Sequence, residues 1–437
     1  MKIIIAAMPF TGHLNPMLGV ARHLADRGHE IVVLTGASQR ARVEAAGLVL
    51  RALPAAIDYA DMDAHFPQRA RLEPGLAQVS FDFEHIFVGP MTQQAEALMA
   101  LSDSWGADLI LAEHLFLGTL PLLMGLHPTR PAIIHCGVCP LLLAREDGAP
   151  IGPGLPYTDD PAVRAHYRDV VTPMVEAVAA PAQASLEAQL AALGVGGRLV
   201  PMMEGPTRLA DLHLQFGVPG LDLPREAMPG HIRFIGLPPT TPTDAPLPSW
   251  TADVDDYGSV VLVTQGTVAN ENFDRLIRPT IEVLADRPDT LVVVTGGGKS
   301  LEGLGPLPAN VRAASYFPLD WLLPKLSALV TNGGFGTVLQ ALAHGVPVVV
   351  AGTTEDKAEV ACRVAHSGAG IDLRTDTPEP QALAAAIDAV LADPAYRTAA
   401  RRLQMEFVAY DSRLMIDVAV ADATNKTASP AARLMRA

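Results

Sequence analysis

A glycine-rich turn with the sequence TNGGFGT occupies residues 331–337. It follows an apolar segment, Leu326 to Val330, that is typical of a buried strand, and it leads into a helix predicted to begin near Phe335. Glycines let backbone N–H groups approach a ligand closely, and the helix N-terminus behind them carries partial positive charge. The turn therefore favours a bound phosphate or diphosphate.

A second strand with a polar end follows the predicted helix. It has the sequence GVPVVV at 345–350 and is followed by Glu355, Asp356 and Lys357. A glycine turn alone can serve backbone geometry only. Two neighbouring strand ends that both carry polar residues form the crevice in which parallel α/β sheets bind ligands.

Strands and helices alternate over most of the remaining chain. We expect strands at 3–7, 30–35, 108–112, 132–134, 259–264, 291–295, 328–331 and 346–350, with helices at 16–27 and 38–46. This alternation predicts an α/β protein with parallel sheets. Two long irregular regions, 55–90 and 148–160, are either binding loops or surface elaboration.

The length of 437 residues favours two domains, and a proline-rich segment divides the chain. Prolines in the linker, residues 236–250, prevent regular structure and stiffen the connection. We therefore predict an N-terminal domain at 1–235, a C-terminal domain at 251–404 and a helical tail at 405–437.

Composition excludes several classes of protein. A net charge of −15 disfavours binding to nucleic acid, since phosphates would be repelled. The apolar start of the chain is short and is interrupted by Pro9, so it predicts a first strand rather than a signal peptide. The apolar region 109–126 contains charged and proline residues, so it predicts no membrane span. We expect a cytoplasmic protein that is a monomer or a homodimer.

Two further motifs are discounted. Cys136 and Cys139 form C-x-x-C within an apolar strand, but no second pair completes a zinc site, so small buried side chains are expected. GGGKS at 296–300 follows a strand as a P-loop does. The first glycine of that motif is replaced by Val293, so the phosphate cradle is incomplete and a turn is expected instead.

The sequence MPFTGHLNP at 8–16 and the segment from Tyr316 to Gly370 resemble the family 1 glycosyltransferases, which use UDP-sugars. The resemblance covers nearly the whole chain in order and spacing. It implies the GT-B fold, in which two Rossmann-like domains face each other across a cleft. It also implies that the last helix returns to pack on the N-terminal domain.

His13 is the candidate catalytic base. Asn15 as N-cap and Pro16 at the first helical position would place it, with Gly12, beside a helix N-terminus, which should keep the imidazole neutral. The resemblance implies that this histidine deprotonates the acceptor, supported by a strand-end carboxylate. The matching position is Glu113; Asp108 is the reserve candidate, although it lies at the other end of the strand.

The resemblance also assigns residues to the donor. Tyr316 and Phe317 would lie against the nucleobase of the donor. Asn332 stands where the family commonly has histidine. Gln340 would bond the ribose, and Asp356 with Lys357 would contact the sugar; Lys357 either favours an acidic or unusual sugar or pairs with Glu355. The implied diphosphate contacts are Gly266, Thr267, Gly333, Gly334, Gly336 and Thr337.

The resulting prediction is an inverting glycosyltransferase that moves a sugar from a UDP-sugar, with UDP-glucose favoured and a TDP-sugar as an alternative, to a hydroxyl of an apolar small molecule such as a natural product. We expect neither a metal nor another cofactor, because backbone dipoles can neutralise the leaving group. Two alternatives are a non-hydrolysing sugar-nucleotide epimerase and a catalytically impaired nucleotide-sugar-binding protein.

Overall fold

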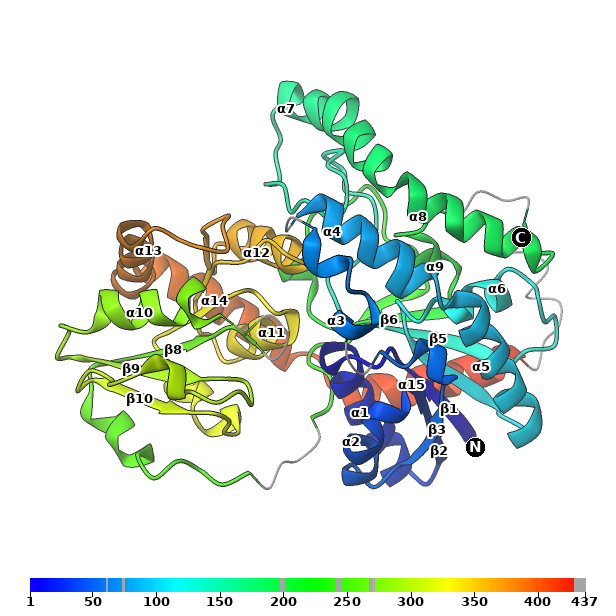
Figure 1. Cartoon of the computed structure of the whole chain (residues 1–437), viewed down its shortest axis with the longest axis horizontal. Coiled ribbons are helices and arrows are strands. Elements are labelled where there is room, and N and C mark those ends of the chain that lie inside the picture. The colour runs from blue at the N-terminus through cyan, green and yellow to red at the C-terminus, as the bar shows by residue number, and fades with distance from the viewer. Residues whose placement is uncertain are drawn as a thin grey trace.

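The chain folds into two α/β domains, which a computed structural model describes for residues 1–59, 62–72, 75–196, 201–240, 245–266, 270 and 272–427. Each domain has one parallel sheet with helices around it (Figure 1). The N-terminal domain extends upward into α7 and α8, while the C-terminal domain lies beside it (Figure 1). The predicted fold class is therefore confirmed.

The N-terminal sheet has seven parallel strands in the order β3-β2-β1-β4-β5-β6-β7. Buried Ile, Leu and Val residues dominate its central strands, as expected for a sheet covered on both faces. The strands are β1 (Lys2–Ala6), β2 (Glu30–Thr35), β3 (Val49–Ala52), β4 (Leu109–Glu113), β5 (Ala132–Gly137), β6 (Leu212–Gln215) and β7 (Ile232–Phe234).

The C-terminal sheet has six parallel strands in the order β10-β9-β8-β11-β12-β13. Its central strands β8, β11 and β12 are again buried and rich in valine. The strands are β8 (Ser259–Thr264), β9 (Thr290–Thr295), β10 (Val311–Ala314), β11 (Ala328–Thr331), β12 (Val348–Val350) and β13 (Gly370–Asp372).

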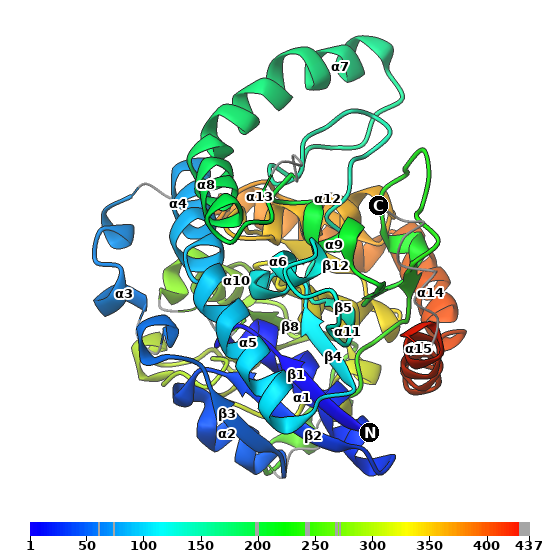
Figure 2. The ribbon, with the colours of Figure 1, turned by 90° about the vertical axis from the view of Figure 1, so that its right-hand side faces the viewer.

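Helices connect the strands of both sheets. In the N-terminal domain they are α1 (Thr11–Asp26), α2 (Arg40–Ala45), α3 (Met62–His65), α4 (Leu76–Phe81), α5 (Met91–Trp105), α6 (Leu120–Leu123), α7 (Pro161–His166), α8 (Thr172–Ala192) and α9 (Gly205–Leu209). The later helices are α10 (Ile277–Leu284), α11 (Phe335–Ala343), α12 (Lys357–His366), α13 (Pro380–Ala392), α14 (Pro394–Val408) and α15 (Ser412–Thr427). Figure 2 shows α4 running beside α8.

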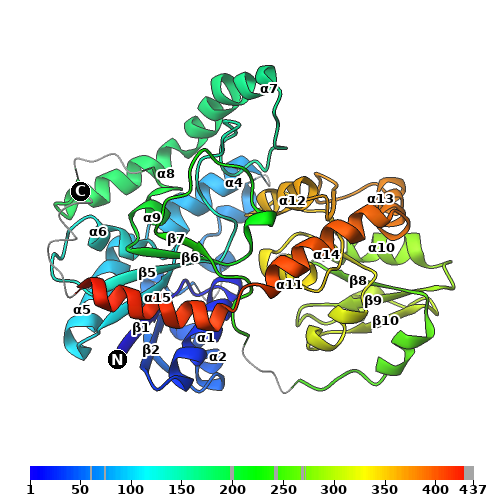
Figure 3. The same cartoon turned by 180° about the vertical axis from the view of Figure 1, so that it is seen from behind.

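The last helix crosses back to the first domain. Seen from behind, α15 lies over the N-terminal sheet and beside α1 (Figure 3). Ile416 and Ala419 are buried in the same hydrophobic cluster as the first strands, and Asp417 forms an ion pair with His23 at 2.9 Å. Helix α15 thus joins the end of the chain to its beginning; residues 428–437 of the predicted tail lie outside the described part.

Strand predictions agree closely with the structure, but the start of α1 was predicted wrongly. The helix begins at Thr11, and Pro16 lies inside it. The side chain of Asn15 does not cap the helix; its Oδ1 accepts a hydrogen bond from Arg42 Nη1 at 3.3 Å. His13 consequently lies in the first turn of α1 rather than before the helix.

The described residues contain no helix that is both long and apolar enough to span a bilayer.

Candidate active site

His13 and Glu113 meet at the carboxyl end of the N-terminal sheet. Nδ1 of His13 lies 3.2 Å from Oε1 of Glu113, the last residue of β4. The Glu113 side chain is fully buried, and its oxygens accept hydrogen bonds from the backbone N–H of Leu115 (2.7 Å) and Met8 (3.4 Å). Asp108 lies at the opposite end of β4, where it accepts a hydrogen bond from the Lys2 amide. Of the two candidate carboxylates, only Glu113 contacts His13.

The pKa values of His13 and Glu113 are shifted by their mutual contact. Burial lowers the pKa of His13, but Glu113 outweighs this effect, helped by Asp356 and Glu355, and the pKa is raised above its ordinary value. Burial likewise raises the pKa of Glu113, but His13 outweighs it and the pKa is lowered. The buried carboxylate therefore moves the pKa of His13 in the direction opposite to the one expected from a helix N-terminus.

Aromatic rings surround the imidazole of His13. The centroids of Phe10 and Phe87 each lie 5.8 Å from that of His13. Phe87 contacts Phe83 at 5.3 Å, and both belong to the π-helical stretch Asp82–Val88. The irregular region at 55–90 thus supplies an apolar wall next to the candidate base, which suits an apolar acceptor.

The glycine turn in the C-terminal domain presents free backbone amides. It runs from the end of β11 to α11, whose N-cap Gly334 makes no side-chain hydrogen bond. The amides of the first turn, which includes Gly336 and Thr337, are therefore available to an anion. Asn332 is buried, and its Nδ2 donates to the Gln265 carbonyl at 2.6 Å, so this side chain fixes the turn against β8.

The polar residues after β12 form the neighbouring part of the site. Lys357 is buried and pairs with Glu355, one of the two roles that the sequence left open for this lysine. Glu355 has a φ of +57°, a left-handed conformation that non-glycine residues adopt at some cost and that is frequent at ligand sites. Burial raises the pKa of Asp356 to about 6. Because Asp356 also influences His13, the two domains face each other at these residues.

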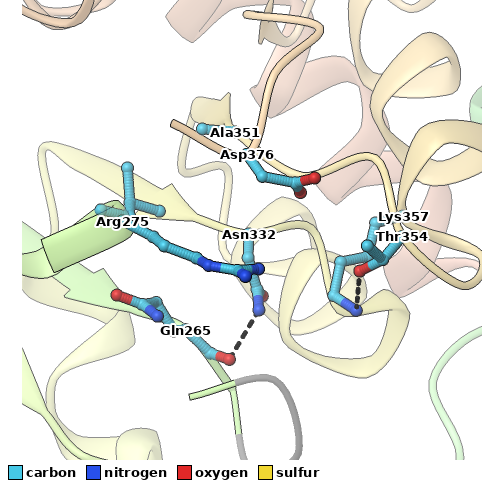
Figure 4. Close-up of a pocket in the computed structure, with 8 residues that line it drawn as sticks. Gln265, Arg275, Asn332, Ala351, Thr354, Lys357 and Asp376 are labelled. Atoms are coloured by element: carbon cyan, nitrogen blue, oxygen red, sulfur yellow. Dashed lines mark hydrogen bonds between the residues drawn. The ribbon is translucent and has the colours of Figure 1, made fainter. Parts of the chain in front are cut away.

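A pocket opens between the ends of β8, β11 and β12 (Figure 4). Arg275 extends into it toward Asn332, while Lys357 donates a hydrogen bond to Thr354 on the other side (Figure 4). Arg275 is exposed, and no ion pair with it is found among the described residues. It precedes α10 without any motif, so sequence reasoning missed it. The other lining residues are Gln265, Leu276, Ala351 and Asp376.

The two aromatic residues predicted to contact the nucleobase, Tyr316 and Phe317, differ in their exposure. Tyr316 is 53% exposed and free to stack on a ligand. Phe317 is 2% exposed, and its ring packs on Trp250 at 5.7 Å. The predicted contact of the Phe317 side chain with the donor is therefore wrong, because successive residues of an extended segment point to opposite sides. Burial lowers the pKa of Arg42 in the N-terminal domain, and Tyr316 lies close enough to counteract part of this effect.

The remaining predicted residues occupy the edges of the same region. Gly12 is exposed at the start of α1, and Gln340 is partly buried on α11 with no described side-chain bond. Gly266 follows β8 with a φ of +70°, whereas Thr267 lies outside the described residues. Gly297 approaches Gly266 so closely that a side chain there would collide with its carbonyl, which places the 296–298 turn beside the site.

The cysteines lie behind the site and are free thiols. Cys136 and Cys139 are both buried, as expected from the sequence. Sγ of Cys139 lies 3.2 Å from Nε2 of His114, whose pKa burial lowers to about 4. Burial raises the pKa of Cys136 to about 12, so this thiol is unreactive.

Comparison with known proteins identifies relatives along the whole chain. Residues 281–414 match the model "Erythromycin biosynthesis protein CIII-like, C-terminal domain". The chain is 35% identical to 4'-demethylrebeccamycin synthase of Lentzea aerocolonigenes, covering 94% of this chain and 96% of that one. It is 32% identical to UDP-glucosyltransferase A1 of Starmerella bombicola, covering 96% and 91%. The crystal structure of CalG4, the calicheamicin glycosyltransferase, superposes with a TM-score of 0.69 at 23% identity, covering 98% and 99%.

Two facing parallel-sheet domains, with a histidine–carboxylate pair in one and an amide turn in the other, define a glycosyltransferase with the GT-B fold. The chain belongs to the family 1 glycosyltransferases.

Proposed function

We propose that this glycosyltransferase moves a sugar from a UDP-sugar, with UDP-glucose as the favoured donor, to a hydroxyl of an apolar natural product. The observation that carries the proposal is the Glu113-supported His13, set in an aromatic wall, with Asp356 of the other domain close enough to influence its pKa. Two relatives, a UDP-glucosyltransferase and 4'-demethylrebeccamycin synthase, support the donor and the acceptor class.

In the proposed reaction, Nε2 of His13 removes the proton of the acceptor hydroxyl as its oxygen attacks the anomeric carbon. The imidazolium that forms is stabilised by the buried Glu113 carboxylate. The bond to the UDP oxygen breaks, and the diphosphate leaves toward the amides of Gly334–Thr337. A single displacement of this kind inverts the anomeric centre. No metal is required where fixed dipoles stabilise the leaving group.

The proposed donor site runs along the C-terminal sheet. Tyr316 stacks on the base, Gln340 bonds the ribose, and Asp356 accepts hydrogen bonds from the sugar. Arg275 supplies a positive charge beside Asn332, which itself cannot carry one. Since stacking does not distinguish uracil from thymine, a TDP-sugar is the alternative donor.

Replacing Gly333 by Ala should weaken UDP binding about tenfold, because the turn would have to shift to relieve a strain of about 1–2 kcal/mol and its amides would move away from the diphosphate. Gly333 has a φ of +96°, and an added Cβ would lie 2.7 Å from Cγ1 of Val350. Isothermal titration with UDP measures the change. Gly303→Ala is the control, because no atom lies within 4 Å of its added Cβ and it is not among the residues lining the pocket; equal losses in the two variants would contradict the proposed turn.

Replacing Arg275 by Ala should raise the Kd for UDP about tenfold, the scale of one hydrogen bond to a charged group. The loss should shrink as salt is raised, because an exposed charge is screened. Arg278→Ala is the matched control: Arg278 lies three residues further along and pairs with Asp274 at 2.6 Å. An unchanged Kd in Arg275→Ala would remove Arg275 from the site.

Acceptor-dependent release of UDP tests the proposed function itself. The purified protein is incubated with UDP-glucose, TDP-glucose or other nucleotide sugars, with and without a panel of apolar phenols and alcohols. The proposal expects UDP release that requires an acceptor. Epimerisation of the donor at C2 would indicate the epimerase instead, and saturable binding without turnover would indicate a binding protein.

A further inference from the structure

A buried carboxylate connects the two domains next to the proposed donor site. Glu359 lies on α12, one turn after Asp356, and is 4% exposed. Its Oε1 accepts hydrogen bonds from the backbone N–H of Gly152 (2.8 Å) and Gly154 (3.2 Å) in the N-terminal domain. A helix of one domain therefore holds a loop of the other through one side chain.

Arg363 fixes this carboxylate from its other side. Nη1 of Arg363 lies 2.5 Å from Oε2 of Glu359, and its Nε lies 3.1 Å from Oδ1 of Asp222 in the N-terminal domain. Arg225 completes the group with a second ion pair to Asp222. All four side chains are at most 8% exposed, so water screens their interactions little.

The loop held by Glu359 reaches the apolar wall near His13. Ile151 packs against the cluster of Leu115, Cys139 and Leu142, to which Phe83 and Phe87 also contribute. The loop is internally braced by a buried ion pair between Arg145 and Asp147. Displacement at Gly152 and Gly154 would therefore be transmitted to Ile151.

We infer that Glu359 is a positioning residue. It holds the apolar wall that includes Phe83 and Phe87 at a fixed position relative to the donor sugar. This inference rests on the proposed function. Asp356 stands immediately before α12, and Ile151 stands beside Gly152, so the Glu359 contact joins the two substrate sites by a short path. Misplacement of an acceptor by about 1 Å can cost about 10²-fold in rate, so a loosened contact should reduce transfer.

Two variants loosen the contact in different ways. Glu359→Gln removes the charge that pairs with Arg363. Gly154→Ala leaves every charge in place but pushes the loop away, because its Cβ would lie 2.1 Å from the Ala358 carbonyl oxygen at a φ of +60°. The second variant keeps the test valid if the buried arginine prevents Glu359→Gln from folding.

Glu406→Gln is the matched control. Glu406 of α14 also accepts an interdomain hydrogen bond from a glycine amide, that of Gly220 at 2.9 Å. It is not among the residues around His13 or the pocket at Arg275. The control therefore reports the effect of losing a domain contact as such.

The experiment measures acceptor KM and kcat at saturating UDP-glucose, the Kd for UDP, and amide hydrogen exchange at 148–160. Glu359→Gln and Gly154→Ala should raise acceptor KM about tenfold or more and speed exchange in the loop, while the Kd for UDP stays within about twofold. Glu406→Gln should leave acceptor KM and loop exchange within about twofold of wild type.

Three results would overturn the inference: an unchanged acceptor KM in both loosened variants, an equal rise in Glu406→Gln, or unchanged loop exchange in Glu359→Gln. Failure of the proposed function is distinguishable, because it would appear as wild-type protein that releases no UDP with any acceptor. Amide hydrogen exchange at 148–160 does not depend on activity, so it tests the Glu359 contact whether or not the proposed function holds.

Discussion

His13→Ala should lower kcat for transfer by about 10²- to 10⁴-fold, the range that a positioned general base contributes. The Kd for UDP should stay within about twofold of wild type, since His13 belongs to the N-terminal domain and the proposed diphosphate contacts belong to the C-terminal domain. Steady-state kinetics and titration calorimetry measure the two quantities.

His23→Ala is a suitable control for this substitution. His23 lies on the same helix, ten residues further along, and its Nε2 pairs with Asp417 of α15. This change should affect stability and leave kcat unaltered. A loss of UDP affinity in His13→Ala, with kcat intact, would place His13 on the donor side and contradict the assigned role.

Glu113→Gln should lower kcat by roughly 10²- to 10⁴-fold, because the imidazolium of His13 loses its buried counter-charge. It should also change the pH profile. Activity requires unprotonated His13 and therefore rises with pH through the pKa of His13. Glu113 raises that pKa, so its neutralisation should move the acidic limb of kcat/KM to lower pH.

Asp108→Asn provides the comparison on the same strand. Asp108 bonds the Lys2 amide at the far end of β4 and does not contact His13. Its substitution should leave the acidic limb in place. A shift of the limb in Asp108→Asn but not in Glu113→Gln would reverse the assignment of the supporting carboxylate.

The sequence predicted the sheets well because their strands carry strong local signals. Runs of buried aliphatic residues, such as β8 and β11, were placed with their bounds correct. Shorter strands with weaker patterns were missed, among them β3, β10 and β13. Their position depends on pairing with neighbours, which local composition does not encode.

Site residues that belong to a sequence motif were predicted. Site residues whose position depends on the packing of distant segments were missed. Glu113 was found at a strand end, and the structure places it against His13. The direction of the pKa shift of His13 was not predicted, because it depends on the contact with the buried Glu113 carboxylate. Arg275 and Glu359 carry no motif. Arg275 shares its pocket with Asn332, and Glu359 accepts hydrogen bonds from the Gly152 and Gly154 amides, which lie far away in sequence. Only the folded chain brings these groups together.

The configuration of the product tests the central claim most directly. With UDP-glucose and an acceptor that supports UDP release, the coupling constant of the anomeric proton in the NMR spectrum reports which face was attacked. Deprotonation by His13 opposite a departing diphosphate predicts the β-glycoside from the α-linked donor, that is, inversion. An α-glycoside would mean retention and would contradict a single displacement between the two domains.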